Sequence, residues 1–131
     1  MTFQSFSVSN RASDDDFRPN KALVRRVQKA RKIRATFFGE DLFGDPAWDI
    51  LLELYSCELG QQRISVSSAS AAADVPATTA LRWMAVLEEK NLVAREKDPL
   101  DGRRVWISLT SHGRLLMDRY FTAFSVTSLT W

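Results

Sequence analysis

The sequence contains little cysteine and histidine, the residues from which disulfide frameworks, metal centres and catalytic triads are often built. Its 131 residues include one cysteine, Cys57, and one histidine, His112. A single cysteine forms neither an internal disulfide framework nor a zinc site, and a single histidine leaves few ways to build a hydrolase triad. The sequence also lacks a glycine-rich phosphate loop, a metal-ligand cluster and a nucleophile motif. We therefore expect a protein that is not an enzyme and has no cofactor or metal.

Long apolar runs are also missing, although the composition is that of a folded protein. No apolar stretch approaches the roughly 18 residues that a membrane span needs, and the N-terminus lacks the pattern of a secretory signal. Hydrophobic residues make up 45% of the chain and aromatic residues 11%, which is enough to form a core. The length fits one domain. We expect a cytoplasmic protein without a membrane partner.

Acidic residues are absent from one stretch near the N-terminus. The whole chain carries 18 basic and 16 acidic residues, and this net charge of +2 neither requires nor excludes a nucleic-acid partner. Between residues 21 and 34, however, every charged residue is basic: Lys21, Arg25, Arg26, Lys29, Arg31, Lys32 and Arg34. Such segregation produces a local positive field on a nearly neutral chain. This basic face either contacts flanking DNA phosphates or is simply solvated.

The apolar pattern predicts a mostly helical chain with one β-hairpin. We expect a flexible tail over residues 1–18 and a domain over residues 19–131. Asp45 and Ser67 are the predicted N-caps of the second and third helices. Helices are predicted over residues 20–38, 46–59, 67–74, 76–90 and from 111 onward, and strands over residues 64–66, 92–96 and 103–109.

Two short helices joined by a tight turn and followed by a β-hairpin form a winged helix-turn-helix. The small residues Ala69, Ser70 and Ala73 would face inward and let the second helix cross closely. On that second helix, the predicted core face consists of Ala80, Trp83, Met84 and Leu87, and the predicted outer face consists of Thr78, Leu81, Arg82, Ala85 and Glu89. An ordinary helical hairpin with a solvated face is the alternative.

The expected DNA contacts lie on the second helix of this pair and on the hairpin. The helix over about residues 76–90 would enter the major groove, because Thr78, Thr79 and Arg82 occupy its first two turns. The hairpin tip, or wing, over residues 97–104 carries Lys97, Arg103 and Arg104. A basic wing reaches phosphates or enters the minor groove. The wing acids Asp98 and Asp101 are expected to bond nearby backbone N–H groups.

The wing sequence D-P-L-D-G-R-R-V-W-I-S-L-T at residues 98–110, with Gly113 three positions later, resembles that of the MarR family of bacterial transcriptional regulators. V-L-E-E-K-N-L-V at residues 86–93 and D-P-A-W-D-x-L-L-x-L-Y at residues 45–55 extend the resemblance, which covers about residues 20–124. It implies a homodimer that binds double-stranded DNA sequence-specifically, with Asp101 supporting Arg103 at the minor groove. The expected DNA-binding residues are Ser67, Ala77, Thr78, Thr79, Arg82, Lys97, Asp101, Arg103 and Arg104.

The resemblance also raises the question of an effector. Some MarR relatives hold small phenolic ligands, and a small aromatic effector is one expectation here. The candidate pocket residues are Phe37, Phe38, Phe43, Trp48 and Tyr55, which are otherwise ordinary core aromatics. Cys57 would be either a peroxide sensor, as in some relatives, or a small buried hydrophobe.

A different class of function competes with DNA binding. Winged helices also serve as protein-interaction adaptors without DNA-binding activity, and exposed Leu81 and Trp106 would suit such a surface. The dependence of binding on salt separates the two hypotheses, because contacts to phosphates weaken steeply with salt and apolar contacts do not.

Overall fold

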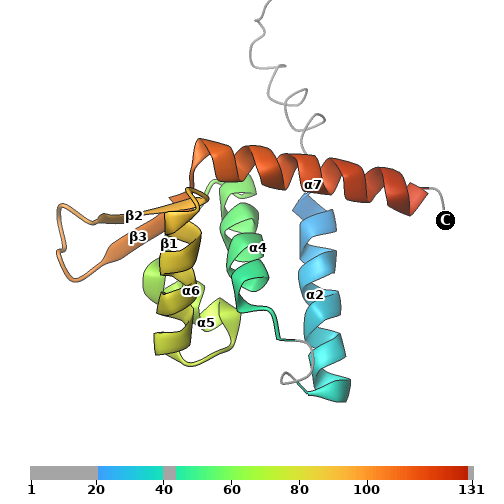
Figure 1. The fold of residues 1–131 in the computed structure, drawn as a ribbon, viewed down its shortest axis with the longest axis horizontal. Helices are drawn as coiled ribbons and strands as arrows, with labels where there is room; N and C mark the ends of the chain where they lie inside the picture. Colours follow the sequence, from blue (N-terminus) through green and yellow to red (C-terminus); the bar gives the residue numbers. More distant parts are fainter. Residues whose placement is uncertain (1–20, 40–43, 130–131) are drawn as a thin grey trace, which may run out of the picture.

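The computed structural model describes residues 21–39 and 44–129, and it confirms a mainly helical winged helix with a small sheet. The tail expected at residues 1–18 lies outside this part. The helices are α2 (Lys21–Phe38), α4 (Pro46–Leu59), α5 (Val66–Ala73), α6 (Ala77–Glu89) and α7 (Ser111–Leu129), and the strands are β1 (Ile64–Ser65), β2 (Val93–Lys97) and β3 (Val105–Leu109). The wing and α2 lie at opposite ends of the molecule, and α7 runs across the ends of α2 and α4 (Figure 1).

Local signals set the ends of the helices largely as predicted. Asp45 caps α4 by accepting a hydrogen bond from the Trp48 backbone N–H at 3.4 Å, with Pro46 in the first turn. Gly39, at φ +87°, ends α2. The predicted cap of α5 was wrong by two residues. Ser65, not Ser67, accepts from the Ser68 N–H at 3.1 Å, because α5 begins at Val66 directly after the short strand.

The three strands form an antiparallel sheet in the order β1-β3-β2. Ile64 pairs with Ile107, and Val93 pairs with Leu109. These four side chains are buried, and they face the helices as the predicted alternation requires. At the tip of the hairpin, β3 is shorter than predicted, since it begins at Val105 rather than at residue 103, while β2 extends one residue further, to Lys97. The loop between them therefore contains both wing arginines.

Helix α4 is at the centre of the core and contacts α2, α5, α6 and β3. Its Tyr55 is fully buried, and the ring stacks on Phe121 of α7 with centroids 5.6 Å apart. The Tyr55 hydroxyl donates to the Asp118 carboxylate at 2.5 Å. Ala69, Ser70 and Ala73 are buried where α5 meets its neighbours, as expected. Within residues 21–39 and 44–129, no helix combines the length and apolar character of a membrane span.

Several apolar residues that were expected in the core are exposed. On α6 the core stripe is Ala80, Met84 and Leu87, and Trp83, predicted to belong to it, is 37% exposed. Helix α6 packs against α4, α5 and β2, and Trp83 lies beyond the edge of this contact. Exposed apolar residues also occur on α2 and α7: Ile33, Phe37, Phe38, Leu115, Leu116 and Tyr120. The two helices therefore leave part of their apolar surfaces uncovered by the described chain.

Gly113 is held against the chain segment that precedes β2. Thr110 donates its N–H to the Leu92 carbonyl and its hydroxyl to the Asn91 carbonyl, at 3.0 and 2.7 Å. The Thr110 hydroxyl in turn accepts from the Gly113 N–H at 2.9 Å and caps α7. A Cβ added at Gly113 would lie 2.2 Å from the Leu92 carbonyl oxygen. Only glycine fits this approach without movement of the backbone.

We expect Gly113→Ala to lower the free energy of unfolding by about 1–3 kcal/mol or more, because the new methyl group clashes with backbone rather than with a flexible side chain. Helix propensity alone would give the opposite sign. Chemical denaturation monitored by circular dichroism measures the change. Gly102→Ala is the control, since a Cβ there meets nothing within 4 Å. A Gly113→Ala protein as stable as the wild type would contradict this account.

Candidate nucleic-acid interface

The first two turns of α6 present polar and basic side chains on the side away from the core. Ala77, Thr78 and Arg82 are exposed, and Thr79 is half-buried, so the first two turns offer a hydroxyl and a guanidinium to a partner. Leu81 is also exposed. No acidic residue lies in the first turn of the helix. The positive end of the helix dipole is therefore not neutralised locally, which favours an anionic partner.

The wing loop is organised by its two aspartates, as expected. The Asp98 carboxylate accepts from the Leu100 N–H at 2.9 Å, and the Asp98 N–H donates to the Arg104 carbonyl at 2.9 Å. The bond from the Leu100 N–H lowers the pKa of the Asp98 carboxyl below its usual value, and the charges of Arg104 and Arg63 act in the same direction. These acids thus build the turn.

Asp101 holds the base of the Arg103 side chain. Its Oδ1 accepts from the backbone N–H of Arg103 at 3.1 Å and from Nε at 3.3 Å. The Arg103 side chain is 93% exposed, so this ion pair adds little to stability. Its effect is to hold the Nε end of the guanidinium beside Asp101, while the Arg103 side chain stays exposed to solvent. The geometry agrees with the supporting role that the resemblance implies for Asp101, and that role stays a prediction.

The start of α5 and the base of the wing enclose a small hollow of about 340 Å³. It is lined by Ser65, Ser67, Asp101, Arg103, Arg104 and Val105. The structure therefore brings together Ser67 and three of the predicted wing residues, although they are far apart in the sequence. Lys97, at the end of β2, is exposed but does not line the hollow. The predicted α6 residues form a separate part of the surface.

One feature of this region was missed from the sequence. Arg63, in the loop before β1, places its Cζ atom 4.1 Å from the centroid of the Trp106 ring, and Arg104 places its Cζ atom 5.2 Å from the same ring. The alternation that places Arg104 and Trp106 on one face of the predicted strand over residues 103–109 was visible in the sequence. Arg63 was not linked to them, because its position depends on the register of β1 against β3.

Known structures share this architecture. The complex of Staphylococcus aureus MepR with DNA superposes with a TM-score of 0.60 at 24% identity, covering 83% of this chain and 87% of that one. A variant of Lactococcus lactis ZitR gives 0.54 at 19% identity, covering 65% and 55% of the two chains. Archaeoglobus fulgidus AF1382 gives 0.55 at 22% identity, covering 72% and 96%. No protein-family model and no curated protein sequence matches the chain.

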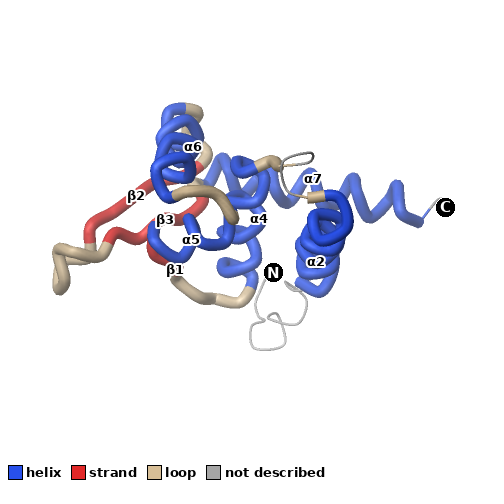
Figure 2. Tube along the Cα trace, turned by 90° about the horizontal axis from the view of Figure 1, so that it is seen from below, coloured by secondary structure: helices blue, strands red, loops and turns tan. Residues whose placement is uncertain are grey.

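The fold is a MarR-like winged helix. The family resemblance of the wing sequence is thereby confirmed at the level of the fold. In this winged helix, α5 and α6 are the helix pair, and β2, β3 and the loop between them are the wing (Figure 2). The assignment of individual DNA-binding residues stays a prediction.

The aromatic residues proposed for an effector pocket do not surround one cavity in this MarR-like winged helix. Tyr55 is buried against Phe121, and Trp48 packs edge-on against Tyr120 with centroids 4.9 Å apart. Phe37 and Phe38, at the end of α2, are 79% and 64% exposed. Phe43 lies outside the described residues. A small aromatic effector stays a prediction without a site among these residues.

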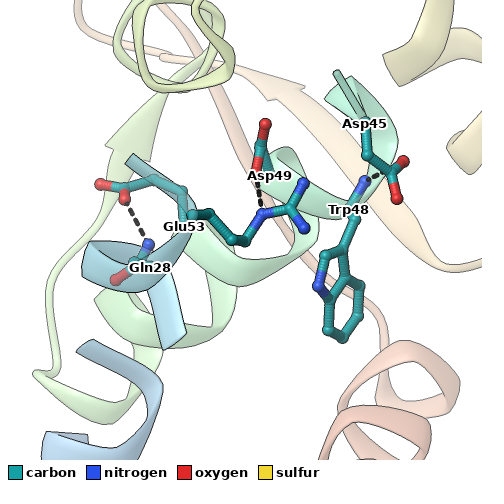
Figure 3. A network of polar contacts seen from close by, with 6 residues as sticks. Gln28, Asp45, Trp48, Asp49 and Glu53 are labelled. Atoms are coloured by element: carbon teal, nitrogen blue, oxygen red, sulfur yellow. Dashed lines mark hydrogen bonds and ion pairs between the residues drawn. The ribbon is translucent and has the colours of Figure 1, made fainter. Parts of the chain in front are cut away.

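A second cleft, wider than the hollow beside the wing, is lined by many charged and polar residues instead. It has a volume of about 1220 Å³ and lies between α2, α4 and the segment that joins α5 to α6. Two side-chain contacts bridge α2 and α4 along it (Figure 3). Arg31 Nε donates to Asp49 Oδ1 at 2.7 Å, and Gln28 Nε2 donates to Glu53 Oε1 at 3.0 Å. These contacts tie the basic helix to the central helix.

Cys57 has the surroundings of an unreactive thiol. It is half-buried on α4, and its Sγ lies 3.7 Å from Glu53 Oε2. Burial raises the pKa of the Cys57 thiol above its usual value, and the nearby Glu53 carboxylate raises it further, while Arg25 and Lys21 oppose the shift. A sensor thiol needs a lowered pKa. The structure thus favours the interpretation of Cys57 as a small packed side chain over that of a peroxide sensor.

Alkylation of Cys57 by iodoacetamide should therefore be slow at neutral pH. Because the pKa of Cys57 is raised, the rate should increase at a higher pH than it does for an ordinary cysteine. Glu53→Gln removes a negative charge beside Sγ and should move the profile to lower pH. The same protein unfolded in urea provides the control, because its thiol is neither buried nor held beside Glu53. Faster alkylation of the folded than of the unfolded protein at neutral pH would refute the shift.

Proposed function

We propose that this protein is a cytoplasmic transcriptional regulator that binds duplex DNA sequence-specifically as a homodimer. The observation that carries the proposal is the MarR-like winged helix with an exposed Arg82 on α6 and an exposed Arg103 on the wing. MepR, which has the same fold, is known in complex with DNA. In the proposed complex, α6 lies in the major groove and the wing lies at the adjacent minor groove.

Each part of this surface has a distinct chemical task. Arg82 can donate two parallel hydrogen bonds to a guanine edge, and Thr78 can bond either a base or a phosphate. Arg103, oriented by Asp101, suits the negative potential of a narrow minor groove. Ser67 and Arg104 line the hollow beside the wing and suit phosphate oxygens, as does exposed Lys97. Specificity therefore comes from α6, and the wing contributes affinity.

The exposed apolar residues of α2 and α7 support a dimer. Five large apolar side chains are between 41% and 79% exposed in the described chain: Ile33, Phe37 and Phe38 on α2, and Leu115 and Leu116 on α7. A second copy would bury them. Helix α2 lies at the end of the molecule away from the wing, and α7 begins beside the sheet and crosses toward α2 (Figure 1). A contact along these helices therefore leaves the wing tip open. Two α6 helices would then address half-sites about 10 base pairs apart.

The adaptor hypothesis loses part of its support. Leu81 is exposed, as that hypothesis requires, but the Trp106 ring lies under the guanidinium groups of Arg63 and Arg104. The surface at the wing base is therefore basic where the hypothesis needs an apolar patch.

Fluorescence anisotropy with a random-sequence duplex tests the proposed function directly. We expect a complex whose affinity falls on the order of 10³-fold between about 50 and about 200 mM salt, because several phosphates are contacted. Sedimentation equilibrium should give the mass of a dimer. No binding at the lower salt concentration would reject the DNA hypothesis and favour a protein-interaction adaptor.

Single variants then separate base contacts from backbone contacts. Arg82→Ala should relax sequence preference at one or two base positions, measured by selection from a random library. Arg103→Ala should weaken binding to all sequences and flatten the salt dependence by about one phosphate equivalent. Arg119→Ala removes the same charge from α7, outside the wing and α6, and serves as the control once sedimentation shows that the variant has the same mass as the wild type. If Arg82→Ala and Arg103→Ala lose the same affinity and neither changes the sequence preference, the assignment of base contacts to Arg82 and backbone contacts to Arg103 is disproved.

A further inference from the structure

The outer face of the sheet carries two arginines on either side of one tryptophan. Ser65 of β1 pairs with Trp106 of β3, so Arg63, two residues before Ser65, lies diagonally from Trp106 on the same face. Arg104 precedes Trp106 by two residues along the chain. The distances of 4.1 Å from Arg63 Cζ and 5.2 Å from Arg104 Cζ to the ring centroid place both guanidinium groups against the indole. Such contacts are cation–π interactions.

The ring of Trp106 takes part in this arrangement, whereas its N–H group does not. The indole Nε1 is buried and has no hydrogen-bond partner among the residues that the structure describes. A buried N–H without a partner costs stability. With no partner, this donor holds neither Arg63 nor Arg104 by a hydrogen bond. Trp106 therefore acts through its aromatic ring, against which the guanidinium groups of Arg63 and Arg104 lie.

Stacking leaves the guanidinium groups able to bind an anion. The five N–H donors of an arginine lie in the guanidinium plane, so contact of that plane with a ring does not consume them. A side chain already held in place also loses less rotamer freedom when a ligand arrives. Arg104 lines the hollow beside the wing, next to Ser65, so the stack continues the basic surface of the wing.

Carboxylates surround this basic surface and limit its charge. Asp101 bonds Arg103, and Asp98 bonds the Leu100 N–H while it feels the charges of Arg104 and Arg63. Glu96 pairs with Trp106 across β2 and β3 and is exposed on the same face. An approaching phosphate would meet Arg63 as an attraction and Glu96 as a repulsion. The two residues therefore provide variants with opposite expected effects.

We propose that Arg63 contacts a DNA phosphate and that Trp106 is a positioning residue that holds Arg63 and Arg104 for this contact. This inference rests on the proposed DNA-binding function. It extends the DNA surface from the wing tip to the outer face of the sheet at the wing base. The contact reads no sequence, because it is made to the backbone of the duplex.

Fluorescence anisotropy with the random-sequence duplex between about 50 and about 200 mM salt tests Arg63. Arg63→Ala should weaken binding severalfold at the lower concentration and reduce the slope of log K against log salt by about 0.9. Glu96→Gln should strengthen binding severalfold. Arg119→Ala removes an arginine from α7 and is the matched control; with the wild-type mass in sedimentation, it should leave the affinity and the slope unchanged. Sequence preference should be unaffected in all three variants.

The positioning role of Trp106 is tested by its own variants. Trp106→Phe keeps an aromatic face and should bind nearly as the wild type, whereas Trp106→Leu should weaken binding severalfold. In a double-mutant cycle with Arg63→Ala, the combined loss should be smaller than the sum of the two single losses, because the leucine substitution would already have released Arg63. Thermal melting checks that each variant is folded. If Trp106→Leu does not fold, the Arg63→Lys variant is measured in its place. This variant keeps the positive charge, so the salt slope should stay the same while the affinity for DNA falls.

The outcomes separate the two proposals. A wild-type protein that does not bind DNA overturns the proposed function and this inference together. Wild-type binding with an unchanged Arg63→Ala variant overturns the phosphate contact alone and leaves the proposed function intact. A third outcome is that Arg63→Ala loses affinity for DNA but the losses in the double-mutant cycle are additive, or that Arg63→Lys binds as the wild type. This outcome overturns the role of Trp106 and retains that of Arg63.

Discussion

The burial of Tyr55 between α4 and α7 is the contact on which the arrangement of the other elements depends. Its ring stacks on Phe121, and its hydroxyl bonds Asp118, so apolar packing and a hydrogen bond act at the same point. Because α4 also contacts α2, α5, α6 and β3, this one helix connects the surfaces at both ends of the molecule. The position of α6 relative to α2 is set through α4.

The surface proposed to meet DNA is built from groups that the core does not need. Arg82 and Arg103 project into solvent, and the ion pair of Arg103 with Asp101 is too exposed to contribute much stability. The aspartates of the wing act instead as turn-forming residues that aim the neighbouring basic side chains. Acidic residues at a proposed DNA surface are thus explained by local backbone geometry rather than by their charge. Binding groups and core groups can therefore vary separately.

Helix α2, at the end of the molecule away from the wing (Figure 1), combines apolar and polar contacts. Val24 of α2 is fully buried in the shared core, whereas Ile33 and Phe37, further along the same helix, are exposed. Between them, Arg31 and Gln28 reach α4 through polar bonds to Asp49 and Glu53. The two parts of α2 thus have different tasks. Its first half belongs to this chain's core, and its second half presents apolar surface for the proposed dimer.

Much of the fold was predictable from the sequence, because the deciding interactions are local. Asp45 and Pro46 begin α4, Gly39 ends α2, and the alternation of Val105, Ile107 and Leu109 marks β3. Each of these signals involves residues a few positions apart, so backbone geometry and period reveal them without knowledge of the rest. The Asp101–Arg103 contact belongs to the same class, although it was inferred from the family resemblance.

Only the tertiary structure decided which apolar faces are covered and which distant side chains meet. Trp83 shares a helix with Met84 yet is exposed, because the width of a buried stripe depends on the neighbouring helix. Periodicity could not show this. Arg63 reaches Trp106 only through the register of β1 against β3, a pairing between segments far apart in the sequence. The sequence by itself determined the elements and their order, since these follow from local chemistry; the tertiary structure determined their exposed surfaces, since these follow from packing partners.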